Sequence, residues 1–116
     1  MKIYSIMDAL SLSRAFADFH DHLSVHGIGE NCLFDCKLVF SELASNAVKH
    51  ADGGTIRVHV TDGEIVITLL GEFVAPEKSV CSPVLEESGR GLYLIDSVCK
   101  SRTNTAEGLQ VVLIKR

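Results

Sequence analysis

The apolar positions of this chain change their spacing along its length, and each spacing predicts a helix or a strand. The first helical stretch carries apolar residues three or four positions apart: Leu12, Phe16, Phe19 and Leu23. That spacing predicts a helix that is capped by Asp8 or Ser11 and ends at Gly27. A second stretch of helical spacing predicts a helix from near Asn31 to about His50.

Strict alternation of apolar and polar residues predicts the strands. Residues 2–6 predict a short edge strand, and residues 56–61 predict a half-buried strand. Asp62-Gly63 is typical of a tight hairpin turn. The returning strand over residues 65–70 is apolar on both faces, which favours a central position in the sheet.

The last third of the chain predicts an irregular segment, a short helix and a hairpin. Residues 72–88 show no period and contain both prolines. A helix is expected over 91–98, followed by paired strands at 100–105 and 109–115. This order of elements predicts an α+β fold: a two-layer sandwich in which a mostly antiparallel sheet carries helices packed on one face.

Composition and charge narrow the class of protein. A length of 116 residues with 47% hydrophobic content predicts a single domain over 1–116 with its own core. The net charge of −4 and the lack of a basic stripe argue against nucleic acid as a partner. No apolar run is long enough for a membrane span, and the N-terminus has no signal-peptide core, so a cytoplasmic location is expected.

Four cysteines raise the question of a metal site. Cys32 and Cys36 lie one helical turn apart, whereas Cys81 and Cys99 are distant in sequence. The chain has no Cys-x-x-Cys ligand pair. We therefore expect the cysteines to be small core residues, with zinc as the minor alternative.

Two polar residues on the second helix are the first candidates for chemistry. Glu42 and Asn46 are four residues apart, so they lie on the same side of the helix. A carboxylate can act as a base, and an amide oxygen can bind a hard cation. A surface helix whose Glu and Asn face water is the alternative that this pair alone leaves open.

A glycine-containing segment supplies the second candidate. In Gly89-Arg90-Gly91-Leu92 the glycines allow close approach of a ligand, and the helix that follows would attract anions at its N-terminus. An ordinary glycine-rich helix entry is the alternative. The spacing is not a dinucleotide-binding fingerprint, because the third glycine is missing.

Together these segments resemble the ATP-binding domain of the GHKL superfamily, which includes gyrase, sensor histidine kinases and anti-sigma-factor serine kinases. Glu42 and Asn46, continued by Lys49 and His50, resemble its N-box, and Gly89-Arg90-Gly91-Leu92 resembles its second glycine box. The likeness is closest to the stand-alone anti-sigma-factor kinases of bacteria. It implies an ATP-binding regulator of transcription that uses ATP and Mg²⁺.

The resemblance also implies a role for each residue. Glu42 would orient or deprotonate the nucleophile, and Asn46 would bind the magnesium ion that bridges the phosphates. The second glycine box would offer backbone amides to the phosphates, with Lys49 and Arg90 as weaker phosphate candidates. The implied protein partner is a sigma factor or an anti-sigma-factor antagonist. Relatives of this type are commonly homodimers, and the sequence leaves the oligomeric state open.

The chain departs from the family pattern at the adenine-reading box. The family has an Asp-x-Gly after the central strand, whereas this chain has Gly71 there, with Thr68 or Leu69 in shifted registers. The resemblance therefore supports two functions. One is an ATP-dependent protein serine kinase, and the other is a non-catalytic pseudo-kinase that binds a regulatory partner.

Overall fold

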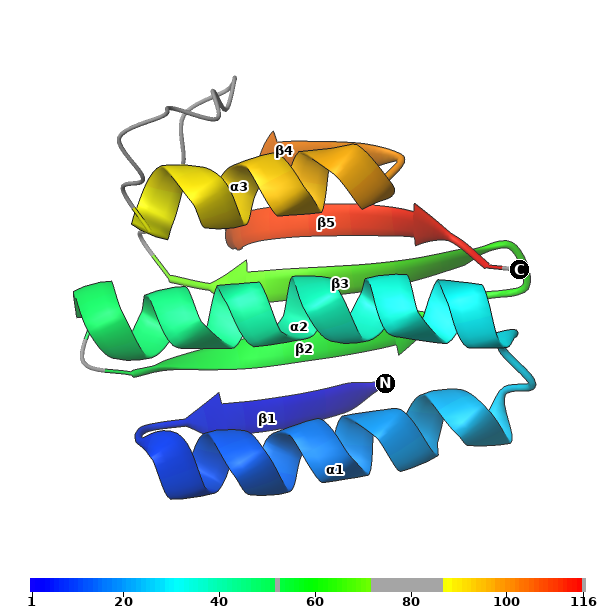
Figure 1. Cartoon of the computed structure of the whole chain (residues 1–116), viewed down its shortest axis with the longest axis horizontal. Helices are drawn as coiled ribbons and strands as arrows, with labels where there is room; N and C mark the ends of the chain where they lie inside the picture. Colours follow the sequence, from blue (N-terminus) through cyan, green and yellow to red (C-terminus); the bar gives the residue numbers. More distant parts are fainter. Residues whose placement is uncertain (52, 72–86, 116) are drawn as a thin grey trace.

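A computed structural model describes residues 1–51, 53–71 and 87–115, and within it a five-stranded sheet carries three helices on one face (Figure 1). The strands lie in the order β1-β2-β3-β5-β4, and every neighbouring pair is antiparallel. The predicted α+β sandwich is therefore confirmed.

The elements follow the chain as β1 (Lys2–Ile6), α1 (Ala9–Val25), α2 (Glu30–Ala51), β2 (Gly54–Val60), β3 (Glu64–Leu70), α3 (Glu87–Val98), β4 (Ser101–Asn104) and β5 (Gly108–Ile114). β1 lies at one edge of the sheet and β3 at its centre, as the sequence predicts. The final hairpin joins the sheet through β5, which pairs with β3.

The core fills the space between the sheet and the helices. Phe19 of α1 and Phe40 of α2 are fully buried, and their stacked rings have centroids 4.4 Å apart. The sheet contributes alternate side chains such as Ile65, Ile67 and Leu69, which point towards the helices. Cys32 and Cys36 belong to this core, and burial is the main cause that raises the pKa of Cys36.

α1 begins and α2 ends close to where the sequence predicts. Asp8 accepts a hydrogen bond from the backbone N–H of Ser11, and the Ser11 hydroxyl oxygen accepts one from the Asp8 N–H, which forms a capping box for α1. After α2, Gly53 adopts a positive φ of 113° and donates its N–H to the Ala47 carbonyl. This closure ends α2 one turn beyond Asn46.

The helix α3 differs from its prediction at the start. It begins at Glu87, four residues before the expected Gly91, so Gly89 and Arg90 lie inside the helix and not in a loop. The reason is that glycine weakens a helix by only about 1 kcal/mol, which the buried residues Leu92 and Ile95 offset by packing on the core. The predicted irregular segment of 72–88 otherwise lies outside the described residues.

Candidate nucleotide site between α2 and α3

The structure brings the two candidate segments together. An ideal Cβ on Gly91 would lie 2.6 Å from Oε2 of Glu42 and 3.9 Å from Nδ2 of Asn46. Gly91 therefore lies against both polar residues of α2, although about forty-five residues separate them in sequence. The alternative of a helix whose Glu and Asn simply face water is excluded, because α3 covers this part of α2.

The two polar residues differ in burial. Asn46 is only 6% exposed and Glu42 is half-buried. Both are held by their neighbours on α2, since Leu43 and Ala47 are buried against the sheet. A buried amide beside a partly accessible carboxylate provides oxygen ligands of the kind that hard cations prefer.

The first turn of α3 adds anion-binding groups to the same place. The first backbone N–H groups of a helix have no partner within the helix, and the first turn of α3 spans residues 87–90. Gly89 therefore lies where free amides and the positive end of the helix dipole favour an anion, and Arg90 follows it in the chain. An oxygen-ligand pair beside a helix N-terminus suits a metal-bound polyphosphate.

Gly91 and Leu92 lie further along α3 than Gly89 and Arg90. They lie in the second turn of α3, where backbone amides bond to carbonyls of the preceding turn. The Leu92 side chain is 5% exposed and belongs to the core. Gly91 packs closely against Glu42, and Leu92 anchors the helix to the core, while the part of both residues in phosphate binding stays a prediction.

The other predicted residues are placed less fully. Lys49 is exposed on α2, one turn beyond Ser45. His50 also belongs to α2, but its side chain lies outside the described part of the structure, as does that of Arg90. Their contact with phosphate stays a prediction.

The three positions considered for the adenine-reading residue face in different directions. Leu69 is buried on the helical side of β3, whereas Thr68 lies on the opposite face of the sheet from Glu42. Gly71 is exposed, with a φ of 132°. Thr68 is therefore excluded as a substitute for the missing aspartate.

The far end of α3 is fixed to the sheet by ion pairing. Arg102 donates two hydrogen bonds to Asp96, of 2.6 and 2.9 Å, and its side chain is only 4% exposed. This bidentate pair joins α3 to β4. The position of Gly91 relative to α2 consequently depends on a helix that is held at both its core face and its C-terminal end.

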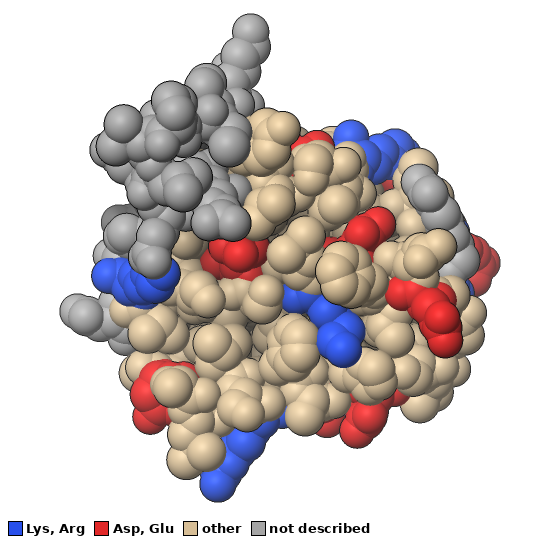
Figure 2. All heavy atoms as spheres, viewed as in Figure 1, with Lys and Arg blue, Asp and Glu red and all other residues tan. Residues whose placement is uncertain are grey.

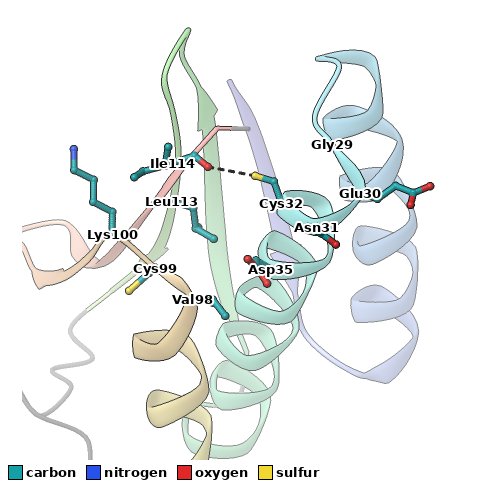
Figure 3. Close-up of a pocket in the computed structure, with 10 residues that line it drawn as sticks. All are labelled: Gly29, Glu30, Asn31, Cys32, Asp35, Val98, Cys99, Lys100, Leu113 and Ile114. Atoms are coloured by element: carbon teal, nitrogen blue, oxygen red, sulfur yellow. Dashed lines mark hydrogen bonds between the residues drawn. The ribbon is translucent and has the colours of Figure 1, made fainter.

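A hollow of about 490 Å³ lies at the opposite end of the α2–α3 groove (Figure 3). It is bordered by Cys32 and Asp35 from the first turns of α2, by Cys99 after α3, and by Ile114 of β5. Cys32 donates a hydrogen bond to the Ile114 carbonyl across it. Among the predicted site residues whose side chains the structure describes, none borders this hollow.

Charges on the helical face are mixed in sign. Figure 2 shows Lys and Arg interspersed with Asp and Glu over the described part of this face, without a continuous basic stripe. Among the described residues, no helix has the length and apolar character to cross a membrane.

The fold is an α+β sandwich in which Gly91 of α3 lies against Glu42 and Asn46 of α2. The model of one family, the histidine kinase-like ATPase domain, matches residues 7–115. The chain therefore belongs to the histidine kinase-like ATPase family. No curated protein matches the chain.

Proposed function

We propose that this domain binds ATP with Mg²⁺ between α2 and α3 and acts as a regulatory protein kinase of the anti-sigma-factor type. The observation that carries the proposal is the contact of Gly91 with Glu42 and Asn46. This contact supports the proposal because a carboxylate and an amide lie next to the N-terminal half of α3. Membership of the ATPase family supports ATP as the nucleotide.

The residues fit the metal and the phosphates. The Asn46 amide oxygen would hold Mg²⁺, and the first-turn amides of α3 would receive phosphate oxygens. When bound, the ion neutralises phosphate charge. The protein itself performs little covalent chemistry in phosphoryl transfer, because positioning and electrostatics supply most of the catalysis.

Glu42 is the residue that we assign to the nucleophile. Its side chain is half-buried, so it keeps some contact with solvent beside the buried Asn46. It would accept the hydroxyl proton as the phosphoryl group is transferred. The proposed acceptor is a serine of an anti-sigma-factor antagonist, and the regulated process is transcription.

The missing aspartate favours a second function. Without an acidic residue at Gly71, adenine loses a charge-assisted hydrogen bond worth roughly 1.5–3 kcal/mol, which weakens affinity about ten- to a hundred-fold. A pseudo-kinase that keeps the fold and binds a regulatory partner is the alternative that this loss supports. The two functions differ in turnover and not in fold.

Two variants on α2 separate binding from turnover. We expect Asn46→Ala to abolish magnesium-dependent binding of a non-hydrolysable ATP analogue, and Glu42→Ala to keep binding while phosphoryl transfer stops. Ser41→Ala on the same helix is the matched control, because its hydroxyl bonds to the Leu38 carbonyl of its own helix. Unchanged affinity in Asn46→Ala would remove Asn46 from the site, and unchanged turnover in Glu42→Ala would remove Glu42 as the base.

A further inference from the structure

Two histidines at the end of α1 form a pair outside the candidate nucleotide site. His22 lies in the last turn of α1, and His26 is the residue that caps this helix. They are four residues apart, so their side chains leave the helix on the same side. Their ring centroids are 4.9 Å apart and the ring planes meet at 81°.

Both rings are open to a ligand from solution. His26 is exposed and His22 is partly exposed. Among the residues that the structure describes, none forms a hydrogen bond with their ring nitrogens, and these nitrogens are not buried. The nitrogen lone pairs of the two rings are therefore available to a ligand.

The separation of the rings fits a shared metal ion. A zinc-like ion binds a histidine nitrogen at about 2.0–2.1 Å, and two such bonds at an angle of about 90–110° place the ring centroids about 4.5–5.2 Å apart. The observed 4.9 Å lies within this range. One nitrogen of each ring can therefore point at a common ion without movement of the helix.

The protonation state of His22 also suits a metal ligand, because only a neutral imidazole has a free lone pair for the ion. Burial is the largest cause that lowers the pKa of His22, followed by the charges of His26 and Lys2. The neutral form is therefore favoured at neutral pH. Lys2 is itself paired with Asp18, at 3.2 Å, so these two charges largely cancel beside the histidines.

We infer that His22 and His26 form a binding site for a divalent transition-metal ion. Imidazole suits zinc, copper and nickel, whereas magnesium prefers oxygen ligands. Among the described residues, no group of three or more His, Cys, Asp or Glu side chains could hold an ion. The pair thus supplies two ligands, and water or a donor from a bound molecule fills the open positions of the ion.

This site is independent of the proposed ATP site. α1 packs on one side of α2 and α3 on the other, so α2 lies between the two sites (Figure 1). The proposed ATP site offers oxygen atoms of Glu42 and Asn46 to Mg²⁺, whereas the histidine pair offers nitrogen. Each site can therefore be tested with its own ion.

The direct test is isothermal titration of the full chain with NiCl₂ and, separately, with ZnCl₂, at neutral pH in a buffer that does not bind metals. MgCl₂ is the control for an ion that prefers oxygen. We expect saturable binding of Ni²⁺ and Zn²⁺ and a melting temperature that rises with their concentration, because the ion binds the folded helix. No saturable binding of either ion, or binding of Mg²⁺ with equal affinity, would overturn the inference.

Histidine variants show whether the pair holds the ion. Even the outer partners of metal ligands contribute about ten- to a hundred-fold to affinity, so His22→Gln and His26→Gln should each raise the Kd for Ni²⁺ at least ten-fold. His59→Gln is the matched control, because His59 is exposed on β2 and alternates with Val58, which is buried under the helices. It should leave the Kd unchanged. Affinity that persists in both pair variants would assign the ion to the cysteine thiols and contradict the inference.

A displaced histidine tests the spacing. Ser24→His in the His26→Gln background restores the number of histidines at the end of α1. Residue 24 follows His22 by two positions, so its side chain leaves the helix on a different side. The double variant should therefore bind Ni²⁺ as weakly as His26→Gln alone. Recovery of the wild-type Kd would show that any nearby imidazole suffices, and it would overturn the assignment of the ion to this pair.

Discussion

The contact between Gly91 and Glu42 makes a sharp prediction for Gly91→Ala. The new Cβ would lie 2.6 Å from Oε2 of Glu42, whereas real contacts of this kind begin near 3.0 Å. Because the carboxylate stands at the end of a flexible side chain, it can move away from α3. The substitution should therefore displace the proposed base and leave the helix in place.

The expected magnitudes have opposite signs for stability and for activity. Replacing glycine by alanine inside a helix stabilises it by about 0.5–1 kcal/mol, which offsets the cost of moving Glu42. A displacement approaching 1 Å lowers a rate by up to about a hundred-fold. Asn46 is 3.9 Å from the new atom, an ordinary contact, so magnesium-dependent binding should persist.

Phosphoryl transfer, calorimetric binding of an ATP analogue and thermal unfolding together decide the outcome. We expect reduced turnover, retained affinity and an unchanged or higher melting temperature. Gly63→Ala is the control, because its Cβ would meet no atom within 4 Å and its φ is ordinary. Full turnover in Gly91→Ala would refute the idea that Glu42 is positioned by the absence of a side chain at residue 91.

Three further predictions concern stability. Thr68→Val should raise the free energy of unfolding by about 1 kcal/mol and the melting temperature by about 3–6 °C, because it removes a buried hydroxyl without a partner among the described residues. A lower melting temperature would show that the hydroxyl has a partner. Gly108→Ala should lower the free energy of unfolding in urea by about 3 kcal/mol or more, because φ is 151° and the new Cβ would overlap the Leu69 carbonyl oxygen. A decrease below about 1 kcal/mol would contradict this close approach of the two backbone segments. Burial first, and then the charge of His26, lower the pKa of His22. The neutral form is thus favoured on folding, so its stabilising contribution is complete above the unfolded pKa of about 6.5 and is lost as pH falls through the lower folded pKa. His22→Gln should flatten the decrease in melting temperature below about pH 6.5, and an unaltered slope would remove His22 as its cause.

Local patterns predict most of the fold because the relevant physics is local. The alternation in β2, the Asp8 cap and the end of α2 near His50 depend on a few residues each, and the structure confirms all three. The predicted start of α3 is wrong because it follows from the poor helix propensity of Gly89 and Gly91. The tertiary packing of Leu92 and Ile95 on the core determines where the helix forms.

The candidate site is predicted in composition but not in arrangement. The spacing of Glu42 and Asn46 places them on one side of a helix, but only the packing of α3 on α2 brings Gly91 to them. The row of polar residues on the other face of the sheet has a weaker signal, because Thr68 alone interrupts an apolar run in the central strand. Its neighbours Arg57 and Gln110 come from other strands, so their meeting depends on sheet register.

The central claim is that α2 and α3 form a magnesium-dependent ATP site. Isothermal titration of the wild-type domain with a non-hydrolysable ATP analogue, with and without Mg²⁺, tests it most directly. We expect saturable binding of the analogue that requires Mg²⁺ and disappears in Asn46→Ala. Binding that is equal with and without the ion, or no binding at millimolar ligand, would contradict it.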